Sequence, residues 1–528
     1  MNISENKTDS KKTVQSRNWW KSLLIFAAVV IWFGTMSRFG FDAHHDGIML
    51  GAAAAVAEGK LLFKEVFCQY GPLAVWIQSI PVWLFGAEDI VIKFTTVVFY
   101  GFIILLGAKI WGRFLKTPFN LLWYCCFLML CPFYMVTFHP WSSVYALFFM
   151  LSGVELQLRF LEEEKTGFLF WAGVCATAAF LCRTPCGIVA FAAGAAVLIL
   201  RSFNKELPDR FRSLVVYSAG AGAVCACFAL YLTLIGAWQD YFRQCFTFIF
   251  KFVVKRGDDW SWTAFSDSML PFTGASGYIN FIFAMLPLLT AAVFLKTIRP
   301  FFYKKWGEQK QNLPLIAVLL LALGAWHQYF PVPCVRHLYW GAIPAFGVFA
   351  LVCQKIWEWE GRSKALRISI LVLLAVPLVY CVSIRSFSAW QYFEKKHQRI
   401  TAQVPSIRGL WIFSGENIVF SRLRQVFDSL PPEIRKRGVV NHTPDGIYSA
   451  LFPFPEGFDH PMFVNWGNSV YQDYNEAVNK LILEKKPSVL TTDFDSLPGY
   501  VELFNFKHFN TVFRFLAPWD ERTGRGNL

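Results

Sequence analysis

The chain has 528 residues, of which 55% are hydrophobic and 16% are charged, and its formal net charge is +14. Soluble proteins carry about 25% charged residues, so this composition excludes an ordinary soluble globular protein. A positive charge would fit a nucleic-acid partner, but no DNA- or RNA-binding motif is present, and much of the excess lies in short loops between apolar segments. We therefore expect a membrane protein and no nucleic-acid partner.

Apolar segments of helical length follow one another through the first three quarters of the chain. An apolar helix of about 20 residues crosses the hydrocarbon core of a bilayer. The eleven expected spans lie near 19–37, 90–110, 119–137, 141–158, 168–182, 187–200, 213–235, 276–295, 312–329, 338–355 and 367–385. The expected fold class is a polytopic α-helical membrane protein.

The distribution of Lys and Arg predicts the orientation of these spans. Residues 1–18 are polar and basic and are expected to form a cytoplasmic tail. Lys and Arg then concentrate in alternate loops, which the positive-inside rule assigns to the cytoplasm. Segment 38–88 becomes the first outer loop, and the C-terminus also lies outside. We expect a multi-pass protein of the bacterial inner membrane, with a periplasmic C-terminal segment.

The composition changes after the last span. Residues 391–528 are charged and contain short β-like runs, WIFSG, GVVNHT, SVLTTDF and TVFRFLAP, together with a helical segment at 471–484. Turn signals such as Pro431-Pro432 separate them. The sequence therefore divides into a tail (1–18), a transmembrane domain (19–390) and a small periplasmic α/β domain (391–528).

The first outer loop contains a dense polar motif, FDAHHDG, directly after the first span. Asp42, His44, His45 and Asp46 lie within five residues. In a helix, the spacing of Asp42, His45 and Asp46 places all three on one face. Charges next to lipid are costly and are generally functional. The alternative is that both Asp residues only cap a surface helix.

The rest of this loop predicts two short surface helices. Residues 51–57 are nearly all Ala and Gly, which permits close packing against neighbouring helices. Gly71-Pro72 breaks the chain and begins a second helix, about 72–85, with Gly86 at its end. Asp89 is expected to cap the second span, with Lys93 one turn later, and neither is assigned any chemistry.

Basic and polar residues at the outer ends of spans are candidates for substrate binding. Arg183 in LCRTPCG and Arg336-His337 in CVRHLYW lie where a lone Arg needs an anion such as a phosphate. The alternative is that each Arg extends to lipid headgroups. Gln69 and Tyr70 could hydrogen-bond a sugar, or could pack beside the break at residues 71–72.

The sequence does not assign a metal site. Adjacent residues such as His44 and His45 rarely chelate one ion well, although Asp42 could hold a divalent cation. The chain has 13 Cys but no CxxC pair, so neither a cysteine zinc site nor a disulfide framework is indicated.

The motif and its position resemble a known group of membrane enzymes. FDAHHDGIMLGAAAAVAEGKLLF…QYGPL, directly after the first span, resembles the GT-C superfamily of membrane glycosyltransferases. Within it, the stretch is most similar to the bacterial branch of protein-mannosyltransferase-like and aminoarabinose-transferase-like proteins. The resemblance covers the N-terminal 200 residues best. It implies a catalytic first outer loop and transfer of a sugar from a polyprenyl-phosphate carrier. The family's Asp-Glu pair is replaced here by Asp42 and Asp46.

Such a transfer requires a base for the acceptor hydroxyl, alignment of that oxygen with the anomeric carbon, and positive charge beside the leaving phosphate. Asp46 is the candidate base, because it lies deepest in the motif and begins the helix. Asp42 would orient it, bind the acceptor or hold a cation. Arg183 and Arg336 would face the phosphate. We expect an inverting transferase that acts on a lipid, polysaccharide or protein, in contact with membrane lipids.

Two other classes of function remain open from the sequence. A transporter or lipid flippase would carry charges in mid-span and broken helices in two related halves. A non-catalytic assembly or sensor protein would use the outer domain as its working part. Neither transporter feature is evident, and the acidic motif lies in a loop rather than at the bilayer midplane. The assembly or sensor class would leave the carboxylates free to change.

Overall fold

The structure is a computed structural model of the whole chain. The expected tail, residues 1–18, lies outside the residues that the structure describes. The described residues are 19–133, 136–203, 211–255, 266, 275–303, 306–330, 333–395, 399–455, 472–508 and 510–519.

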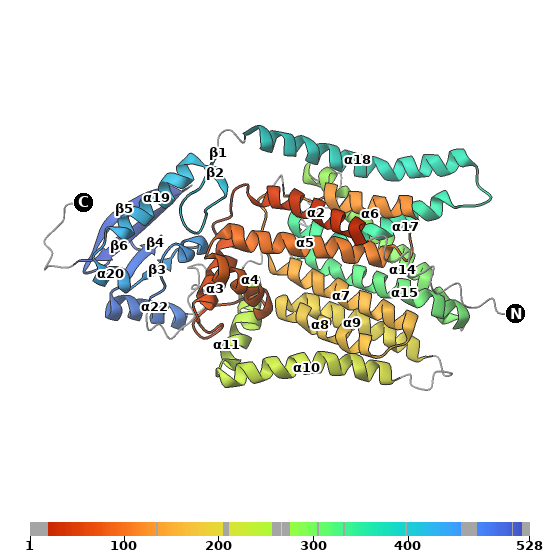
Figure 1. The fold of residues 1–528 in the computed structure, drawn as a ribbon, viewed down its shortest axis with the longest axis horizontal. Coiled ribbons are helices and arrows are strands. Elements are labelled where there is room, and N and C mark those ends of the chain that lie inside the picture. The colour runs from red at the N-terminus through yellow and green to blue at the C-terminus, as the bar shows by residue number, and fades with distance from the viewer. Residues whose placement is uncertain are drawn as a thin grey trace.

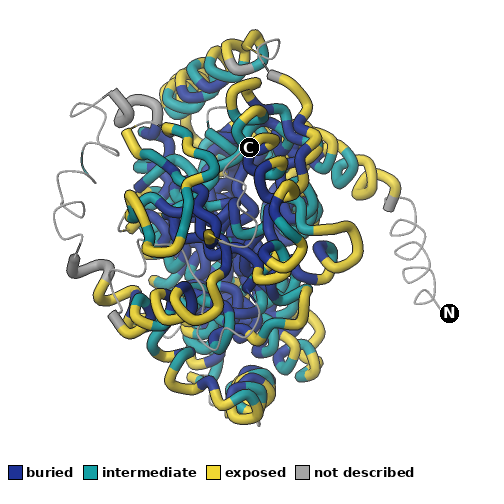
Figure 2. The backbone as a smooth tube through the Cα atoms, turned by 90° about the vertical axis from the view of Figure 1, so that its left-hand side faces the viewer, coloured by how far each residue is buried: buried dark blue, intermediate teal, exposed yellow. Residues whose placement is uncertain are grey.

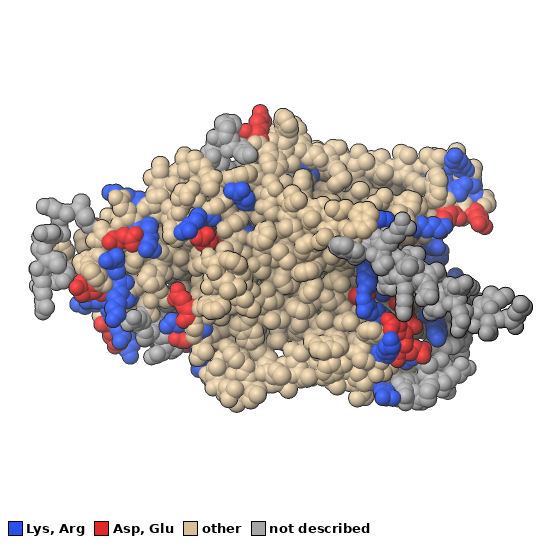
Figure 3. Space-filling view, viewed as in Figure 1, with Lys and Arg blue, Asp and Glu red and all other residues tan. Residues whose placement is uncertain are grey.

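A bundle of long apolar helices forms most of the molecule (Figure 1). Nine helical segments in the described part of the chain are long and apolar enough to cross a membrane. They comprise α2 (Trp19–Ser37), α5 (Asp89–Trp111), α7 (Ser142–Glu163), α9 (Thr184–Ser202), α10 (Arg212–Leu234), α14 (Ala275–Phe302), α15 (Trp306–Gly324) with η3 (Ala325–Tyr329), α16 (Val335–Ala342) with η4 (Ile343–Ala345) and α17 (Phe346–Trp357), and α18 (Lys364–Glu394). On the face shown in Figure 3, charged side chains gather at the two ends, and few lie between them. The predicted polytopic helical fold is confirmed.

Two of the expected spans are helices that are shorter than a membrane crossing. They are α6 (Thr117–Met129) and α8 (Gly167–Cys182). The predicted end of α6 at residue 137 was wrong. The helix stops at Met129, and Pro132 follows at a position where proline cannot continue a helix. The described residues 130–133 and 136–141, between α6 and α7, lie outside helices and include His139.

Two short helices connect α2 to α5, as the sequence predicts. They are α3 (His45–Ala57) and α4 (Pro72–Phe85). Both lie at the end of the bundle that faces the C-terminal segment (Figure 1). The small residues 51–55 of α3 are buried. A Cβ on Gly71, at the start of α4, would lie 2.0 Å from the carbonyl oxygen of Leu181, so this entry to α4 requires glycine.

The C-terminal segment contains its own four-stranded sheet, in the order β3-β4-β6-β5. β3 and β4 are parallel, and the other neighbours are antiparallel. The strands of this sheet are β3 (Val439–His442), β4 (Ser488–Thr491), β5 (Tyr500–His508) and β6 (Thr511–Pro518). The other elements are the hairpin β1 (Arg399–Thr401) and β2 (Trp411–Phe413), with α19 (Ser414–Asp428), α20 (Pro432–Lys436), η6 (Gly446–Ala450) and α22 (Gln472–Lys485). Four strands and α22 match predicted segments, whereas α19 and β5 were not predicted.

The C-terminal segment packs directly against the first loop. The backbone N–H of Trp411 donates to Arg38 O at 2.7 Å, and that of Gly40 donates to Trp411 O at 2.9 Å. η6 lies on α3, where Ile447 N–H donates to Ala43 O at 3.0 Å. A Cβ on Gly47 would lie 1.9 Å from Ile447 N, so only glycine permits this approach. One buried hydrophobic cluster continues from the helices into this segment, and buried backbone fills the centre of the molecule (Figure 2).

Candidate active site

A buried ion-pair network lies where the first turns of α3 and α5 meet. Lys93 Nζ lies 3.0 Å from Asp46 Oδ2 and 2.8 Å from Asp89 Oδ2, and it donates to Gly40 O at 2.9 Å. All three charged side chains are 0% exposed. A buried charge is tolerated when it is paired in this way. The network therefore fixes the start of the loop motif against the start of α5.

His139 extends this network from the non-helical segment between α6 and α7. Its Nδ1 lies 2.6 Å from Asp46 Oδ1, and its Nε2 lies 3.7 Å from Asp42 Oδ2. The imidazole is only 2% exposed. Burial lowers the pKa of His139, and the charge of Arg336 lowers it further, although Asp46 opposes both effects.

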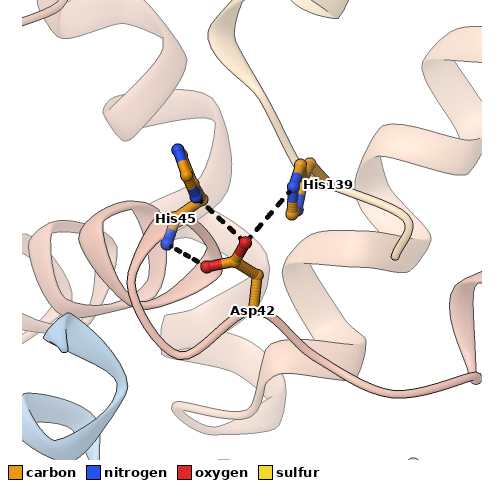
Figure 4. A group of neighbouring side chains, drawn as sticks. All are labelled: Asp42, His45 and His139. Atoms are coloured by element: carbon orange, nitrogen blue, oxygen red, sulfur yellow. Dashed lines mark hydrogen bonds and ion pairs between the residues drawn. The ribbon is translucent and has the colours of Figure 1, made fainter. Parts of the chain in front are cut away.

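Asp42 is the carboxylate at the accessible side of the cluster, with 28% of its side chain exposed. Its Oδ1 accepts the backbone N–H groups of His44 at 3.1 Å and His45 at 2.8 Å. Its Oδ2 lies 3.0 Å from His45 Nδ1 (Figure 4). Burial raises the pKa of Asp42, but the hydrogen bond from His45 and the charges of His45 and His139 outweigh it and hold that pKa well below its usual range.

Asp46 differs from Asp42 in its exposure. It is completely buried, and its Oδ2 also accepts the backbone N–H of Asp42 at 3.0 Å. Burial raises the pKa of Asp46, but Lys93 and His139 more than offset this and lower it. Of the three clustered carboxylates, Asp42, Asp46 and Asp89, only Asp42 has exposed surface.

The two adjacent histidines have different partners. The His45 ring lies 5.3 Å from the His139 ring and 41% of its side chain is exposed. His44 Nδ1 instead makes a short contact with Pro444 O in the C-terminal segment. The two rings are perpendicular, with centroids 4.9 Å apart. The motif thus points one imidazole into the acidic cluster and the other toward the C-terminal segment.

An aromatic layer connects the acidic cluster to Arg183. The Trp141 ring lies 5.3 Å from His45 and 5.1 Å from Tyr70. The Arg183 guanidinium lies 5.9 Å from the Tyr70 ring and donates a short hydrogen bond to Ser143 Oγ. Burial raises the pKa of Tyr70 to about 12, although Arg183 and a hydrogen bond with Gln69 oppose the rise.

Arg336 and His337 lie in the first turn of α16. The charge of Arg336 contributes to the lowered pKa of His139. Both residues also act on Cys334. Burial raises the pKa of that thiol, but hydrogen bonding and charge from His337, together with the charge of Arg336, lower it to about 6. The structure therefore gathers the residues predicted from the sequence at one end of the bundle.

Three residues of this site were not predicted from the sequence: His139, Asp89 and Lys93. Asp89 was expected to be the cap of its helix, but Glu88 is the N-cap, and Asp89 is the first helical residue and pairs with Lys93. The i,i+4 spacing of Asp89 and Lys93 is a signal for an ion pair. His139 was hidden by the expectation that α6 continues almost to it.

Asp42, His45 and His139 could together hold a metal ion. Each offers one ligand atom, and these atoms all lie within 4.8 Å of one another. The expectation of a divalent cation thus has a candidate site, which includes one of the two histidines of the motif and not the other.

Comparison with known proteins supports the fold. No family model matches the sequence, and no curated protein matches it. ArnT from Cupriavidus metallidurans bound to undecaprenyl phosphate is similar in structure, with a TM-score of 0.52 and 11% identity over 94% of this chain and 98% of that chain. ArnT from the same organism in the apo state also matches, with a TM-score of 0.47 and 12% identity over 95% of this chain and 98% of that chain. The Archaeoglobus fulgidus oligosaccharyltransferase in the apo form matches with a TM-score of 0.44 and 12% identity over 90% of this chain and 70% of that chain. The chain therefore shares its fold with ArnT, which agrees with the fold expected from the resemblance of the loop motif.

Proposed function

We propose that this chain is a glycosyltransferase that moves a sugar from a polyprenyl-phosphate donor to an acceptor at the membrane surface. The fold supports this proposal, because the similar ArnT structure holds undecaprenyl phosphate. The cluster around Asp42 supplies carboxylates, and Arg183 and Arg336 supply positive charge at the same end of the bundle. Asp42, His44, His45, Gln69, Tyr70 and His337 would line the site of the sugar and the acceptor.

The observation that carries the proposal is an accessible carboxylate held by a buried network. A general base must come within hydrogen-bond distance of the acceptor hydroxyl. Asp46 was expected to be that base, but its complete burial and its pairing with Lys93 and His139 keep it from such contact. We therefore assign the base to Asp42, and we make Asp46 a positioning residue.

The transfer would proceed by inversion at the anomeric carbon. The acceptor oxygen attacks from the side opposite the phosphate, the bond between the carbon and the phosphate oxygen breaks, and the hydroxyl proton passes to Asp42. A carboxylate with a low pKa is a weak base, so it would accept the proton late, when the sugar–phosphate bond is largely broken. Arg183 and Arg336 would stabilise the leaving polyprenyl phosphate.

The acceptor would be a lipid, a polysaccharide or a protein at the periplasmic face of the bacterial inner membrane. The C-terminal segment covers α3 through η6 and contacts His44, so it would form one wall of the acceptor path. The alternation of basic loops along the sequence supports this orientation.

The test compares purified wild type with Asp42→Asn in nanodiscs that contain a panel of polyprenyl-phosphate sugars. We expect wild type to release free polyprenyl phosphate and Asp42→Asn to release it at least a hundredfold more slowly. A loss of this size is typical when a general base is missing. Glu58→Gln, at the other end of α3, is the folding-matched control and should keep the rate. Release by Asp42→Asn at the wild-type rate would reject Asp42 as the base. Transbilayer movement of the donor by wild type without release would favour a flippase.

A further inference from the structure

We infer that Arg385 binds the phosphate group of a membrane phospholipid where α18 packs against α14. Arg385 lies on a helix that carries none of the residues assigned to sugar transfer, so the inference does not depend on the proposed function.

The guanidinium of Arg385 is a buried charge that the surrounding protein does not satisfy. The side chain is completely buried, and its Nε donates to Cys381 Sγ at 3.3 Å. The ring of Phe283 in α14 lies with its centroid 5.4 Å from the guanidinium carbon. Nη1 and Nη2 have no hydrogen-bond partner in the part of the chain that the structure describes. A buried charge is costly unless it is paired, so these two nitrogens call for an anion.

The position of Arg385 along α18 gives the depth of that anion. Arg367, in the first turn of α18, donates to Trp357 O at the end of α17. Arg385 follows Arg367 by 18 residues, a rise of about 27 Å in an α-helix. This is close to the thickness of the hydrocarbon core, about 30 Å. Arg385 therefore lies at the opposite boundary of that core, at the end of the bundle that faces the C-terminal segment (Figure 1).

An aromatic side chain marks the same boundary. Trp390 follows Arg385 by little more than one helical turn, and 69% of it is exposed. Tryptophan rings gather at the level of the lipid headgroups. The anion that pairs with Arg385 thus lies at the depth of lipid phosphates.

The surface of α18 favours a lipid over a free ion. The helix lies along an edge of the bundle (Figure 1), and only 6% of its apolar stretch is buried inside the protein. Its outer faces expose the large apolar side chains of Val372, Leu373, Val376, Val379 and Phe387. In a membrane, acyl chains cover these side chains, so a lipid that lies along α18 carries its phosphate to the level of Arg385.

Small side chains separate the guanidinium from the headgroups. Ser388 and Ala389 follow Arg385 by three and four residues, so they continue its face of the helix toward the membrane surface. Both are half-buried. The long Arg side chain can turn past them, since such side chains extend along apolar surface to reach the interface.

The chemistry of the side chain selects a phosphate diester. The planar guanidinium binds two phosphate oxygens at once, which would satisfy Nη1 and Nη2 together. The single negative charge of the diester would compensate the single positive charge of Arg385. The phosphate predicted for the sugar donor has other partners, because Arg183 is the N-cap of α9 and Arg336 lies in the first turn of α16.

The experiment measures lipid binding by the full chain without turnover. Delipidated wild type and Arg385→Met in detergent are titrated with phosphatidylglycerol, and native mass spectrometry counts the retained lipid. We expect wild type to retain one copy and Arg385→Met to bind it about tenfold to a hundredfold more weakly, the effect of losing a hydrogen-bonded charge. Diacylglycerol, which lacks the phosphate, should be retained by neither. Equal retention of phosphatidylglycerol by both proteins would overturn the inference.

Thermal unfolding separates lipid binding from a structural role of Arg385. Because Arg385→Met removes an unpaired buried charge, it should melt no lower than wild type in lipid-free detergent. Phosphatidylglycerol should raise the melting temperature of wild type and not that of the variant. A variant that melts lower without lipid, and gains as much from lipid as wild type, would show that Arg385 only packs on Phe283. If Arg385→Met does not fold, Arg385→Lys keeps the charge without the planar fork and should bind the lipid more weakly than wild type.

Arg367→Met is the matched control, because Arg367 lies at the other end of the same helix. It should retain phosphatidylglycerol as wild type does, and an equal loss in both variants would assign the effect to α18 as a whole and overturn the inference. Undecaprenyl phosphate and inorganic phosphate identify the source of the phosphate. If either of them binds in an Arg385-dependent way in place of phosphatidylglycerol, the phospholipid is rejected.

Discussion

Lys93 Nζ lies 3.0 Å from Asp46 Oδ2, and neither side chain has any exposed surface. The pair connects the first turn of α3, which carries the loop motif, to α5 in the bundle. Asp89 completes the pairing from the same helix as Lys93. Removal of one partner from such a group leaves a buried charge without compensation.

We therefore predict that Lys93→Met strongly destabilises the protein. The expected loss is about 3–5 kcal/mol, the usual cost of breaking a buried ion pair from one side. Thermal unfolding in detergent, followed by tryptophan fluorescence, measures it. Lys109→Met is the control on the same helix. Lys109 is 46% exposed and pairs with Glu155, so its loss should cost no more than about 1 kcal/mol. Equal effects of the two substitutions would contradict the network.

The approach of η6 to α3 predicts a sharp difference between two glycines on α3. A Cβ on Gly47 would lie 1.9 Å from Ile447 N and 2.4 Å from Gly446 C, whereas one on Gly51 would lie 3.4 Å from Ser449 Cβ. Gly47→Ala should separate the C-terminal segment from α3, and Gly51→Ala should be tolerated. Limited proteolysis measures the difference as faster cleavage within the C-terminal segment of Gly47→Ala. Identical cleavage of both variants would argue against this contact.

The low pKa of Asp42 predicts the pH dependence of its contribution to stability. Its folded-state pKa lies below the unfolded value of about 3.9, so Asp42 stabilises the fold fully above that value and loses this effect as pH falls through the folded pKa. The difference in melting temperature between wild type and Asp42→Asn should therefore stay constant from pH 5 to about pH 4. It should shrink only at lower pH. A difference that already declines above pH 5 would show that the Asp42 carboxylate is not stabilised in its ionised form.

Arg183 is expected to act on the phosphate of the donor. Arg183→Gln should raise KM for a polyprenyl-phosphate sugar about tenfold or more and lower kcat, because the charge faces the leaving group. Steady-state release of polyprenyl phosphate measures both constants. Arg201→Gln provides the control, since Arg201 lies in the last turn of the same helix, α9, whose N-cap is Arg183. If both variants lose activity equally, the effect comes from α9 and not from the phosphate contact.

The sequence alone was sufficient to predict the membrane helices and to locate the polar motif. Hydrophobic length predicted all nine candidate spans of the described residues, but it also predicted spans at α6 and α8, which are shorter. The motif with Asp42, His45 and Asp46 pointed to the candidate site. Neither property depends on distant parts of the chain. Asp46, by contrast, was expected to act on substrate, because sequence spacing does not reveal which of two carboxylates is covered by Lys93 and His139.

The parts of the site that the sequence did not predict depend on contacts between distant segments. His139 reaches Asp46 across 93 residues, and only the early end of α6 allows it. The docking of η6 on α3 depends on the close approach of two backbones. Such an approach produces no hydrophobic pattern in the sequence, and its glycines look like those of ordinary turns. β5 was not predicted because its apolar residues are interrupted by Glu502, Asn505 and Lys507.

The contact between His44 and Pro444 joins residues that are 400 positions apart. During synthesis the acidic motif leaves the ribosome about 400 residues before the segment that covers it. Non-local contacts of this kind form late, after the intervening chain has been placed. The polar motif therefore remains partly uncovered until the C-terminal segment with η6 has been translated. Its assembly is thus a step of late biogenesis, and a chain that stalls before η6 would leave the membrane helices inserted and the site unfinished.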